Sequence, residues 1–275
     1  MEIREILRKN NFRFNKRFGQ NFISDENLLE EIVEKSGADN NTVAVEIGCG
    51  AGTLTRAVAA KVKKIYGFEI DRSLEPVLKE TLKGCGNAEI IFKDIMRMKT
   101  EEIESLIGEK YMLIANLPYY ITTPVLMKFV GEAANCYKIV VMVQEEVAQR
   151  LCAKAGTEAY GAITAGIDVV GDAEIIERVN RSMFYPVPNV DSAVVKITIN
   201  RNKFAVSDMK IYRDVVRAAF SSRRKTLVNN LIQSFGMDRS GAENFLNECG
   251  IDKSVRGEVL TTEQFVRLAN ARADK

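Results

Sequence analysis

Between residues 42 and 143, short apolar segments alternate with amphipathic ones, and this alternation constrains the fold more than any other feature of the chain. Five apolar segments have the length of buried strands, at 42–47, 64–70, 88–92, 111–115 and 137–143. Helical patterns separate them, near 53–62, 73–83, 100–107 and 122–134. Strands that alternate with helices predict a parallel sheet covered by helices on both faces.

The pattern changes after residue 160. Two more strands are predicted at 174–179 and 192–199, joined by a loop at the sheet edge. From about residue 205 the strands stop, and helical patterns follow near 208–219, 224–234, 240–248 and 262–272. We therefore predict an α/β domain at 1–202, with a basic N-terminal arm at 1–24, and a helical domain at 203–275.

Absent residue types exclude several function classes. The chain has no histidine, which excludes histidine bases, histidine-activated nucleophiles and histidine-ligated metals. Its five cysteines form no CxxC pair, so we expect neither a disulfide framework nor a metal site. No apolar stretch approaches the roughly 20 residues needed to span a membrane. The N-terminus has no apolar signal-peptide core. We expect a cytoplasmic protein with no membrane partner.

A glycine-rich turn follows the first predicted strand, in the segment VAVEIGCGAGTLT at 43–55. The strand carries the acidic residue Glu46, and the turn contains Gly48, Gly50 and Gly52. Glycines allow a tight turn and a close approach of the backbone to a ligand. A GxGxG turn alone is a weak signal, because an ordinary strand-to-helix turn also uses glycine.

The next two strands strengthen the prediction of a cofactor site. Glu69 ends the second strand, about 20 residues after the turn, where a carboxylate can accept hydrogen bonds from ribose hydroxyls. Asp94 follows the third strand, where it can accept from an adenine amino group. A nicotinamide dehydrogenase uses similar geometry, but its turn is GxGxxG and this chain has no obvious proton shuttle. We therefore predict S-adenosylmethionine as the cofactor.

The fourth strand leads into Asn116-Leu117-Pro118-Tyr119-Tyr120, which suits transfer to an amino nitrogen. The N6 lone pair of adenine is delocalised into the ring, so acceptors must hold its N–H groups and direct the lone pair. The Asn116 side-chain oxygen and a backbone carbonyl, that of Leu117, are predicted to do this, with Pro118 fixing the backbone. Tyr119 is predicted to stack on the flipped base.

A second aromatic candidate is Phe184, in the proline-stiffened segment SMFYPVP at 182–188. Its ring is predicted to close the other face of the base. The alternative is that Phe184 or Tyr185 fills the core.

These segments together resemble the KsgA-type ribosomal RNA small-subunit adenine dimethyltransferases. The similarity covers nearly the whole chain, at 16–22 (KRFGQNF), 45–55, 68–71 (FEID), 116–126, 142–151, 184–195 and 220–231 (FSSRRKTLVNNL). The first and last segments are not shared with methyltransferases at large. Three positions depart from the family pattern, with Ile23 in place of Leu, Gly257 in place of Ala, and Thr261 in place of Ser.

The resemblance implies a class I methyltransferase fold, Rossmann-like, with a seven-stranded sheet, a reversed edge strand and a small C-terminal all-helical domain. It also implies which residues contact the cofactor. Asn21 and the backbone of Ile23 contact it, Gly48 lies at its methionine end, Glu69 at its ribose and Asp94 at its adenine. Asn116 contacts both the cofactor and the target. We add Gly50 from the turn. The implied reaction dimethylates two adjacent adenines in a hairpin loop near the 3′ end of 16S rRNA.

The implied partner is an assembling small ribosomal subunit (30S), with a late-assembly checkpoint role, and we expect a monomer. The charge distribution agrees with an RNA partner, because 1–17 carries about +4 and 201–256 about +5 in a chain of net charge +2. The predicted phosphate contacts are Lys16, Arg17, Arg223, Arg224 and Lys225.

Three other functions stay open at this point. A 23S rRNA adenine methyltransferase of the resistance type would use the same chemistry. A non-catalytic ribosome assembly factor could keep the fold without the reaction. A DNA adenine methyltransferase would need a sequence-reading domain larger than the roughly 70 C-terminal residues.

Overall fold

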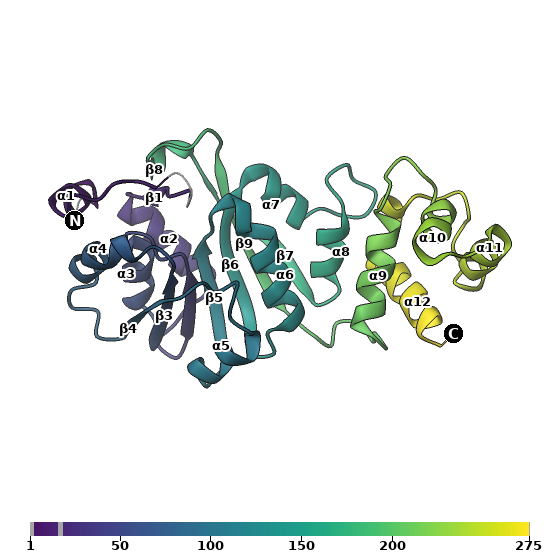
Figure 1. Ribbon diagram of the computed structural model, residues 1–275, viewed down its shortest axis with the longest axis horizontal. Helices are drawn as coiled ribbons and strands as arrows, with labels where there is room; N and C mark the ends of the chain where they lie inside the picture. Colours follow the sequence, from purple (N-terminus) through teal and green to yellow (C-terminus); the bar gives the residue numbers. More distant parts are fainter. Residues whose placement is uncertain (1–2, 16–18, 275) are drawn as a thin grey trace. The chain divides into compact units, whose positions relative to one another are not determined.

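The chain divides into two compact units in the computed structural model, which describes residues 3–15 and 19–274 (Figure 1). The first unit consists of residues 1–148 and 174–199, and the second of residues 149–173 and 200–275. These units differ from the predicted domains, 1–202 and 203–275, because the segment 149–173 groups with the C-terminal helices.

A seven-stranded sheet forms the centre of the first unit, in the order β4-β3-β2-β5-β6-β9-β7. Its strands are β2 (Val43–Ile47), β3 (Lys64–Glu69), β4 (Ala88–Phe92), β5 (Tyr111–Asn116), β6 (Cys136–Gln144), β7 (Gly171–Val179) and β9 (Ser192–Ile199). Neighbouring strands from β4 to β6 pair in parallel, and β9 pairs with β6 antiparallel. The predicted seven-stranded sheet is confirmed. The reversed strand was predicted at the edge, but β9, which runs antiparallel to β6, lies one place in from the edge, between β6 and β7.

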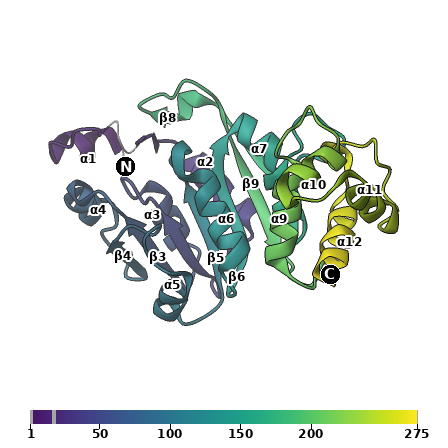
Figure 2. The ribbon, with the colours of Figure 1, turned by 45° about the vertical axis from the view of Figure 1, so that its right-hand side comes forward.

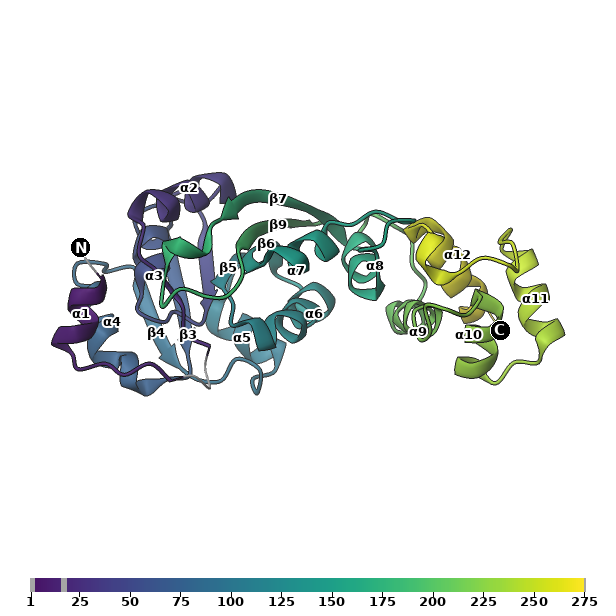
Figure 3. The ribbon, with the colours of Figure 1, turned by 90° about the horizontal axis from the view of Figure 1, so that it is seen from above.

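The central strands are apolar because both of their faces are covered. Every residue of β2 is buried, including Glu46. Helices α2 (Glu26–Ser36) and α3 (Thr53–Ala59) pack on one face, around Ile32, Val58 and Met112. Helices α5 (Thr100–Ile107) and α6 (Thr122–Glu132) lie on the other face, as the view from above shows (Figure 3).

Capping explains where α2 begins and ends. The Asp25 side chain accepts a hydrogen bond from the backbone N–H of Leu28 at 2.9 Å, which satisfies one of the free N–H groups of the first turn. Gly37 adopts the left-handed conformation (φ 71°) and closes the last turn. The remaining helical elements of this unit are α1 (Ile3–Lys9), η2 (Arg72–Leu74), α4 (Glu75–Thr81), η3 (Tyr119–Ile121) and η4 (Arg181–Met183).

A second, two-stranded sheet lies above the carboxyl edge of the large one (Figure 1). It pairs β1 (Phe22–Ile23) with β8 (Phe184–Tyr185) antiparallel. It therefore joins the N-terminal arm to the loop between β7 and β9. Helix α1 buries Ile3, Ile6 and Leu7 in a cluster with Phe22, which gives the arm an apolar anchor.

The second unit is helical. Its helices are α8 (Ala162–Asp168), α9 (Met209–Ala219), α10 (Leu227–Phe235), α11 (Arg239–Glu248), η5 (Gly257–Val259) and α12 (Thr262–Ala273), and α7 (Glu145–Leu151) links the units (Figure 2). Hydrogen bonds connect α8 to Lys203 and to the C-terminal helices. The Tyr212 hydroxyl donates to the Ala165 carbonyl at 2.9 Å, and Asp168 bonds both Lys203 and Thr262. These contacts explain why segment 149–173 belongs with this unit.

None of the helices in the described part of the chain is long and apolar enough to cross a membrane.

Candidate active site

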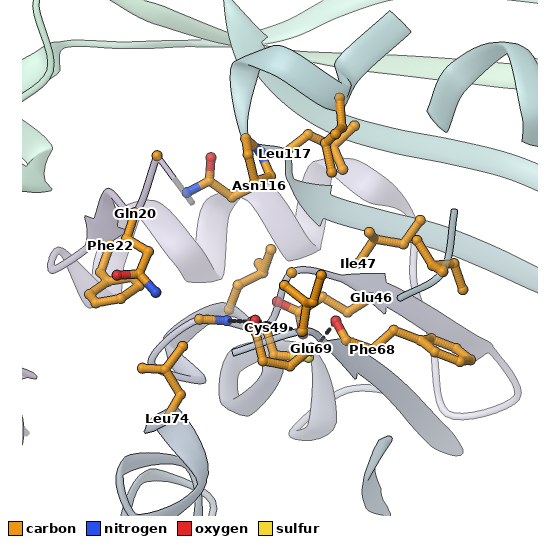
Figure 4. A pocket seen from close by; sticks show the side chains of 18 of the residues that line it. Gln20, Phe22, Glu46, Ile47, Cys49, Phe68, Glu69, Leu74, Asn116 and Leu117 are labelled. Atoms are coloured by element: carbon orange, nitrogen blue, oxygen red, sulfur yellow. Dashed lines mark hydrogen bonds between the residues drawn. The ribbon is translucent and has the colours of Figure 1, made fainter. Parts of the chain in front are cut away.

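A cavity of about 250 Å³ opens where β2, β3, β4 and β5 end. Parallel strands bring their carboxyl ends to one edge, so residues far apart in sequence meet there. Every residue predicted for the cofactor lines this cavity, namely Asn21, Ile23, Gly48, Gly50, Glu69, Asp94 and Asn116. Leu117 and Pro118 line it too (Figure 4 labels Glu69, Asn116 and Leu117 among the lining residues).

The glycine turn is shaped by backbone that other residues rarely adopt. Gly48 and Gly50 have φ of 74° and 55°. At Gly50 a Cβ atom would lie 2.7 Å from the ring of Phe22, which packs directly on the turn. The turn can therefore carry no side chain here, and its backbone forms the floor of the cavity.

Glu69 is a buried and rigid acceptor. One carboxylate oxygen accepts from the N–H of Gly50 at 2.8 Å, and the other from the N–H groups of Ile70 and Asp71 at 2.7 and 2.8 Å. Burial raises the pKa of Glu69, and the three N–H groups oppose that rise. Because a carboxylate has about four acceptor positions, one remains for a ligand hydroxyl. This geometry agrees with the predicted ribose contact.

Asp94 follows β4 and is held by its own loop. Its Oδ1 accepts from the N–H of Met96 at 3.0 Å, and its Oδ2 lies 3.3 Å from Nε of Arg97. The carboxylate keeps further acceptor positions at the cavity wall, where the adenine amino group is predicted.

The orientation of the Asn116 amide is fixed by the arm. Its Nδ2 donates to the backbone carbonyl of Asn21 at 3.0 Å. A carbonyl can only accept, so the group that faces Asn21 is the NH₂, and the amide oxygen is left as the acceptor at the cavity. The next residue, Leu117, is buried, and the Pro118 backbone has φ −54° and ψ 131°.

The arm is held to the sheet beside this amide. Gln20 Nε2 donates to Asp71 Oδ2 at 2.7 Å, and Asp71 lies two residues after Glu69 and donates its own N–H to the Glu69 carboxylate. Ile23 is 2% exposed and pairs with Phe184 in the two-stranded sheet. The arm therefore joins the residues at the ends of β3 and β5 through two hydrogen bonds.

Phe184 does not take the predicted position beside the base. Its side chain is 1% exposed, packs in the same core cluster as Ile23 and Leu29, and is not part of the cavity wall. The alternative of a core aromatic is the one that the structure shows. Sequence could not separate the two, because a proline-flanked aromatic looks the same whether its ring points inward or outward.

Two aromatic positions follow Pro118. The backbone of Tyr119 begins η3, and its side chain lies outside the described part of the structure. Tyr120, which received no role in the sequence analysis, is 60% exposed and lines the cavity. Its exposure was not readable from sequence, since both tyrosines follow the proline in one irregular turn.

The predicted phosphate contacts fall in different places. Lys16 and Arg17 lie outside the described residues. Arg223, Arg224 and Lys225 are exposed in the second unit. The Arg223 guanidinium donates to the carbonyls of Glu158 and Tyr160 at 3.2 and 2.8 Å, so part of its role is to hold that loop.

The wall of the cavity fits S-adenosylmethionine. Carboxylates and an amide oxygen match the hydroxyl and amino donors of a nucleoside, and the side-chain-free turn leaves room for a ligand. Glu46 adds a buried carboxyl whose Oε2 has no hydrogen-bond partner among the described residues. Among these residues, no group of three Cys, Asp or Glu side chains could hold a metal ion.

Comparisons with known proteins agree with this assignment. The chain is 41% identical to ribosomal RNA small subunit methyltransferase A of Geobacillus thermodenitrificans (strain NG80-2), over 98% of this chain and 94% of that protein. It is 42% identical to the protein of the same name from Bacillus cereus (strain AH187), with the same coverage.

Two solved structures share the fold at 23% sequence identity. One is a dimethyladenosine transferase from Plasmodium falciparum, with a TM-score of 0.74 over 90% of this chain and 95% of that one. The other is the 23S rRNA methyltransferase ErmE, with a TM-score of 0.70 over 91% and 98%. A family model described as ribosomal RNA adenine dimethylase matches residues 11–274. The chain therefore belongs to the ribosomal RNA adenine dimethylase family.

Proposed function

We propose that this chain transfers methyl groups from S-adenosylmethionine to adenine N6 in 16S rRNA, and dimethylates two adjacent adenosines near its 3′ end. The observation that carries the proposal is the orientation of Asn116. Its amide oxygen is the acceptor left at the cavity, at the same sheet edge as Glu69 and Asp94. Methyl transfer to an amino nitrogen needs such an acceptor next to a nucleoside-binding cavity.

The proposed roles follow from the chemistry of the cofactor and of the target adenine. Glu69 binds the ribose and Asp94 the adenine of the cofactor, which supplies an electrophilic methyl group when bound. Asn116 Oδ1 and the Leu117 carbonyl accept the N–H groups of the target and direct its lone pair. No strong base is needed, because the proton becomes acidic once the nitrogen carries positive charge. This agrees with a chain without histidine.

The names of the curated relatives support the small subunit as the substrate. Both relatives at 41% and 42% identity are named as small subunit methyltransferases, whereas ErmE, at 23%, is similar in fold alone. We propose that the chain acts as a monomer on an assembling 30S particle in the cytoplasm, as a late checkpoint. In the proposed division of labour, residues 1–202 bind the cofactor and residues 203–275 bind RNA.

Transfer of a labelled methyl group to ribosomal particles tests this function. Purified 30S and 50S particles from unmethylated cells are each incubated with the chain and labelled cofactor, and the RNA is digested to nucleosides. We expect N6,N6-dimethyladenosine from 30S particles. Asn116→Ala should give almost none, whereas Asn41→Ala, which changes an exposed asparagine before β2, should act as the wild type. Label in 50S alone would favour the 23S enzyme, and function without Asn116 would favour an assembly factor.

A further inference from the structure

Glu46 is a buried acid inside the cofactor cavity that no step described above uses. It is the second-last residue of the buried strand β2, is 1% exposed and lines the cavity (Figure 4). Its Oε2 has no hydrogen-bond partner among the described residues. An ionised carboxylate in this position would be costly, since no described side chain pairs with this oxygen.

The groups around Glu46 do not supply a compensating charge. Glu69 faces it from the end of β3, and Cys49 from the turn. The Thr55 hydroxyl faces it from α3, and its neighbour on β5 is Ile114. Lys93, exposed, and Asp94 line the same cavity from the end of β4.

The pKa of Glu46 follows from these surroundings. Burial raises it to about 8, the negative charge of Glu69 acts in the same direction, and the Thr55 hydroxyl opposes them. Burial also raises the pKa of the neighbouring Cys49 thiol, so that thiol adds no charge near neutral pH. The free chain therefore favours the neutral, protonated form of Glu46 at pH 7.

We infer that Glu46 releases its proton when the cationic cofactor enters the cavity, and that the carboxylate so formed is a counter-ion for the cofactor's positive charge. This inference rests on the proposed function. The O–H bond of the carboxylic acid breaks, its electron pair stays on the carboxylate, and the proton goes to the solvent buffer. A cation in a cavity shielded from water favours the ionised acid strongly, because opposite charges attract more at low dielectric.

Calorimetry in two buffers of different ionisation heat measures the released protons directly. At pH 7 we expect the wild type to release about one proton more per bound cofactor than Glu46→Gln. The difference between the two proteins removes any proton that the cofactor's own amino group exchanges. Glu89→Gln, which changes an exposed acid on strand β4, two strands away from β2, should release as many protons as the wild type.

The pH dependence of affinity gives a second readout. Because the ionised form of Glu46 binds the cofactor, affinity should increase as the pH rises toward 8. The dissociation constant of the wild type should then fall by up to about tenfold per pH unit, relative to that of Glu46→Gln. Infrared difference spectra should show a protonated carboxyl band in the free wild type that disappears with cofactor. If Glu46→Gln fails to fold, Glu46→Met provides the uncharged side chain.

Three outcomes separate this inference from the proposed function. Cofactor binding with equal proton release in the wild type and both Glu46 variants would overturn the inference and leave the function intact. A free wild type without the protonated carboxyl band would also overturn it. Absence of binding heat in every protein would instead overturn the proposed function, and the inference with it.

Discussion

At the scale of single residues, the proposed chemistry depends on which atom of the Asn116 amide faces the cavity. The Asn21 carbonyl holds the NH₂ group, so the oxygen is available to a target N–H. The arm that supplies this carbonyl also donates a hydrogen bond to Asp71, two residues after Glu69. The same short segment therefore contacts Asn116, the proposed acceptor for the target, and Asp71, which bonds Glu69, the proposed acceptor for the ribose.

Replacing Asn116 by alanine should slow methyl transfer by about 100-fold or more, because the target nitrogen loses its positioning acceptor. Asn116→Asp keeps an oxygen acceptor but faces the Asn21 carbonyl with a second oxygen, so the rate should also fall. Single-turnover transfer of labelled methyl groups measures both rates, with Asn41→Ala as control. A rate for Asn116→Ala within twofold of the wild type would contradict the assigned role.

The raised pKa of Glu46 also predicts how the free energy of unfolding depends on pH. The folded chain raises its pKa from 4.5 to about 8, so the folded state keeps a proton that the unfolded state loses in this range. The free energy of unfolding must then fall as the pH rises from 4.5 to 8, by at most about 5 kcal/mol for this group. Glu46→Gln should not show this part of the fall. Urea unfolding of both proteins at pH 5 and pH 8 measures it, and parallel changes in the two would contradict it.

At the scale of elements, the arm segment 19–23, here called the strap, lines the cavity and is hydrogen-bonded to Asp71 and Asn116. Gln20→Ala removes its hydrogen bond to Asp71 and should weaken cofactor binding by roughly 3- to 10-fold, the value of one typical hydrogen bond. Calorimetric titration with cofactor measures the affinity. Gln233→Ala, an exposed glutamine in α10, is the matched control. Equal losses in both variants would show that the effect is not specific to the strap.

The last helix offers a prediction about capping. Thr261 and Gln264 form a capping box at the start of α12. The Gln264 N–H donates to Thr261 Oγ1 at 3.4 Å, and the Thr261 N–H donates to Gln264 Oε1 at 2.9 Å. Thr261→Ala should lower the free energy of unfolding by about 1 kcal/mol, whereas Thr261→Ser keeps the hydroxyl and should change it little. Urea unfolding of the three proteins tests this, and a larger loss for serine than for alanine would refute it.

Sequence periodicity predicted the elements that have enough residues to show a period. The strands of the large sheet and the four C-terminal helices agree with the predicted ranges to within a few residues. The strands β1 and β8 were not predicted, because two residues cannot display an alternation and the pair forms only by contact between distant segments. Helix α1 was missed for a similar reason, since its seven residues lie within a segment noted only for its charge.

The candidate site could be predicted where the chemistry follows strand ends. Glu69, Asp94 and Asn116 meet because parallel strands end at one edge. Tertiary packing decides three features that no local pattern encodes. These are the direction of the Phe184 ring, the exposure of Tyr120 and the hydrogen bonds of Arg223. The sequence shows that an acidic residue stands at position 46. It does not show that one oxygen of this carboxyl group has no hydrogen-bond partner among the described residues.

At the scale of the whole molecule, the two units divide the chemistry from the basic surface. The cavity is lined by residues of the first unit, whereas Arg223, Arg224 and Lys225 belong to the second. The guanidinium of Arg223 is used within the unit, so Arg224 and Lys225 are the better candidates for phosphate contacts. Phosphate contacts release counterions from RNA, and their number is therefore readable from the salt dependence of binding.

The double variant Arg224→Ala/Lys225→Ala should weaken binding to 30S particles and reduce the slope of log affinity against log salt by roughly 1.5 to 2. Its affinity for the cofactor should not change, since no residue of the cavity wall is altered. Lys63→Ala, which breaks an exposed ion pair with Glu109, is the control for the loss of surface charge as such. If the double variant and this control lower the salt slope equally, the effect is one of net charge, and these two side chains do not contact the phosphates.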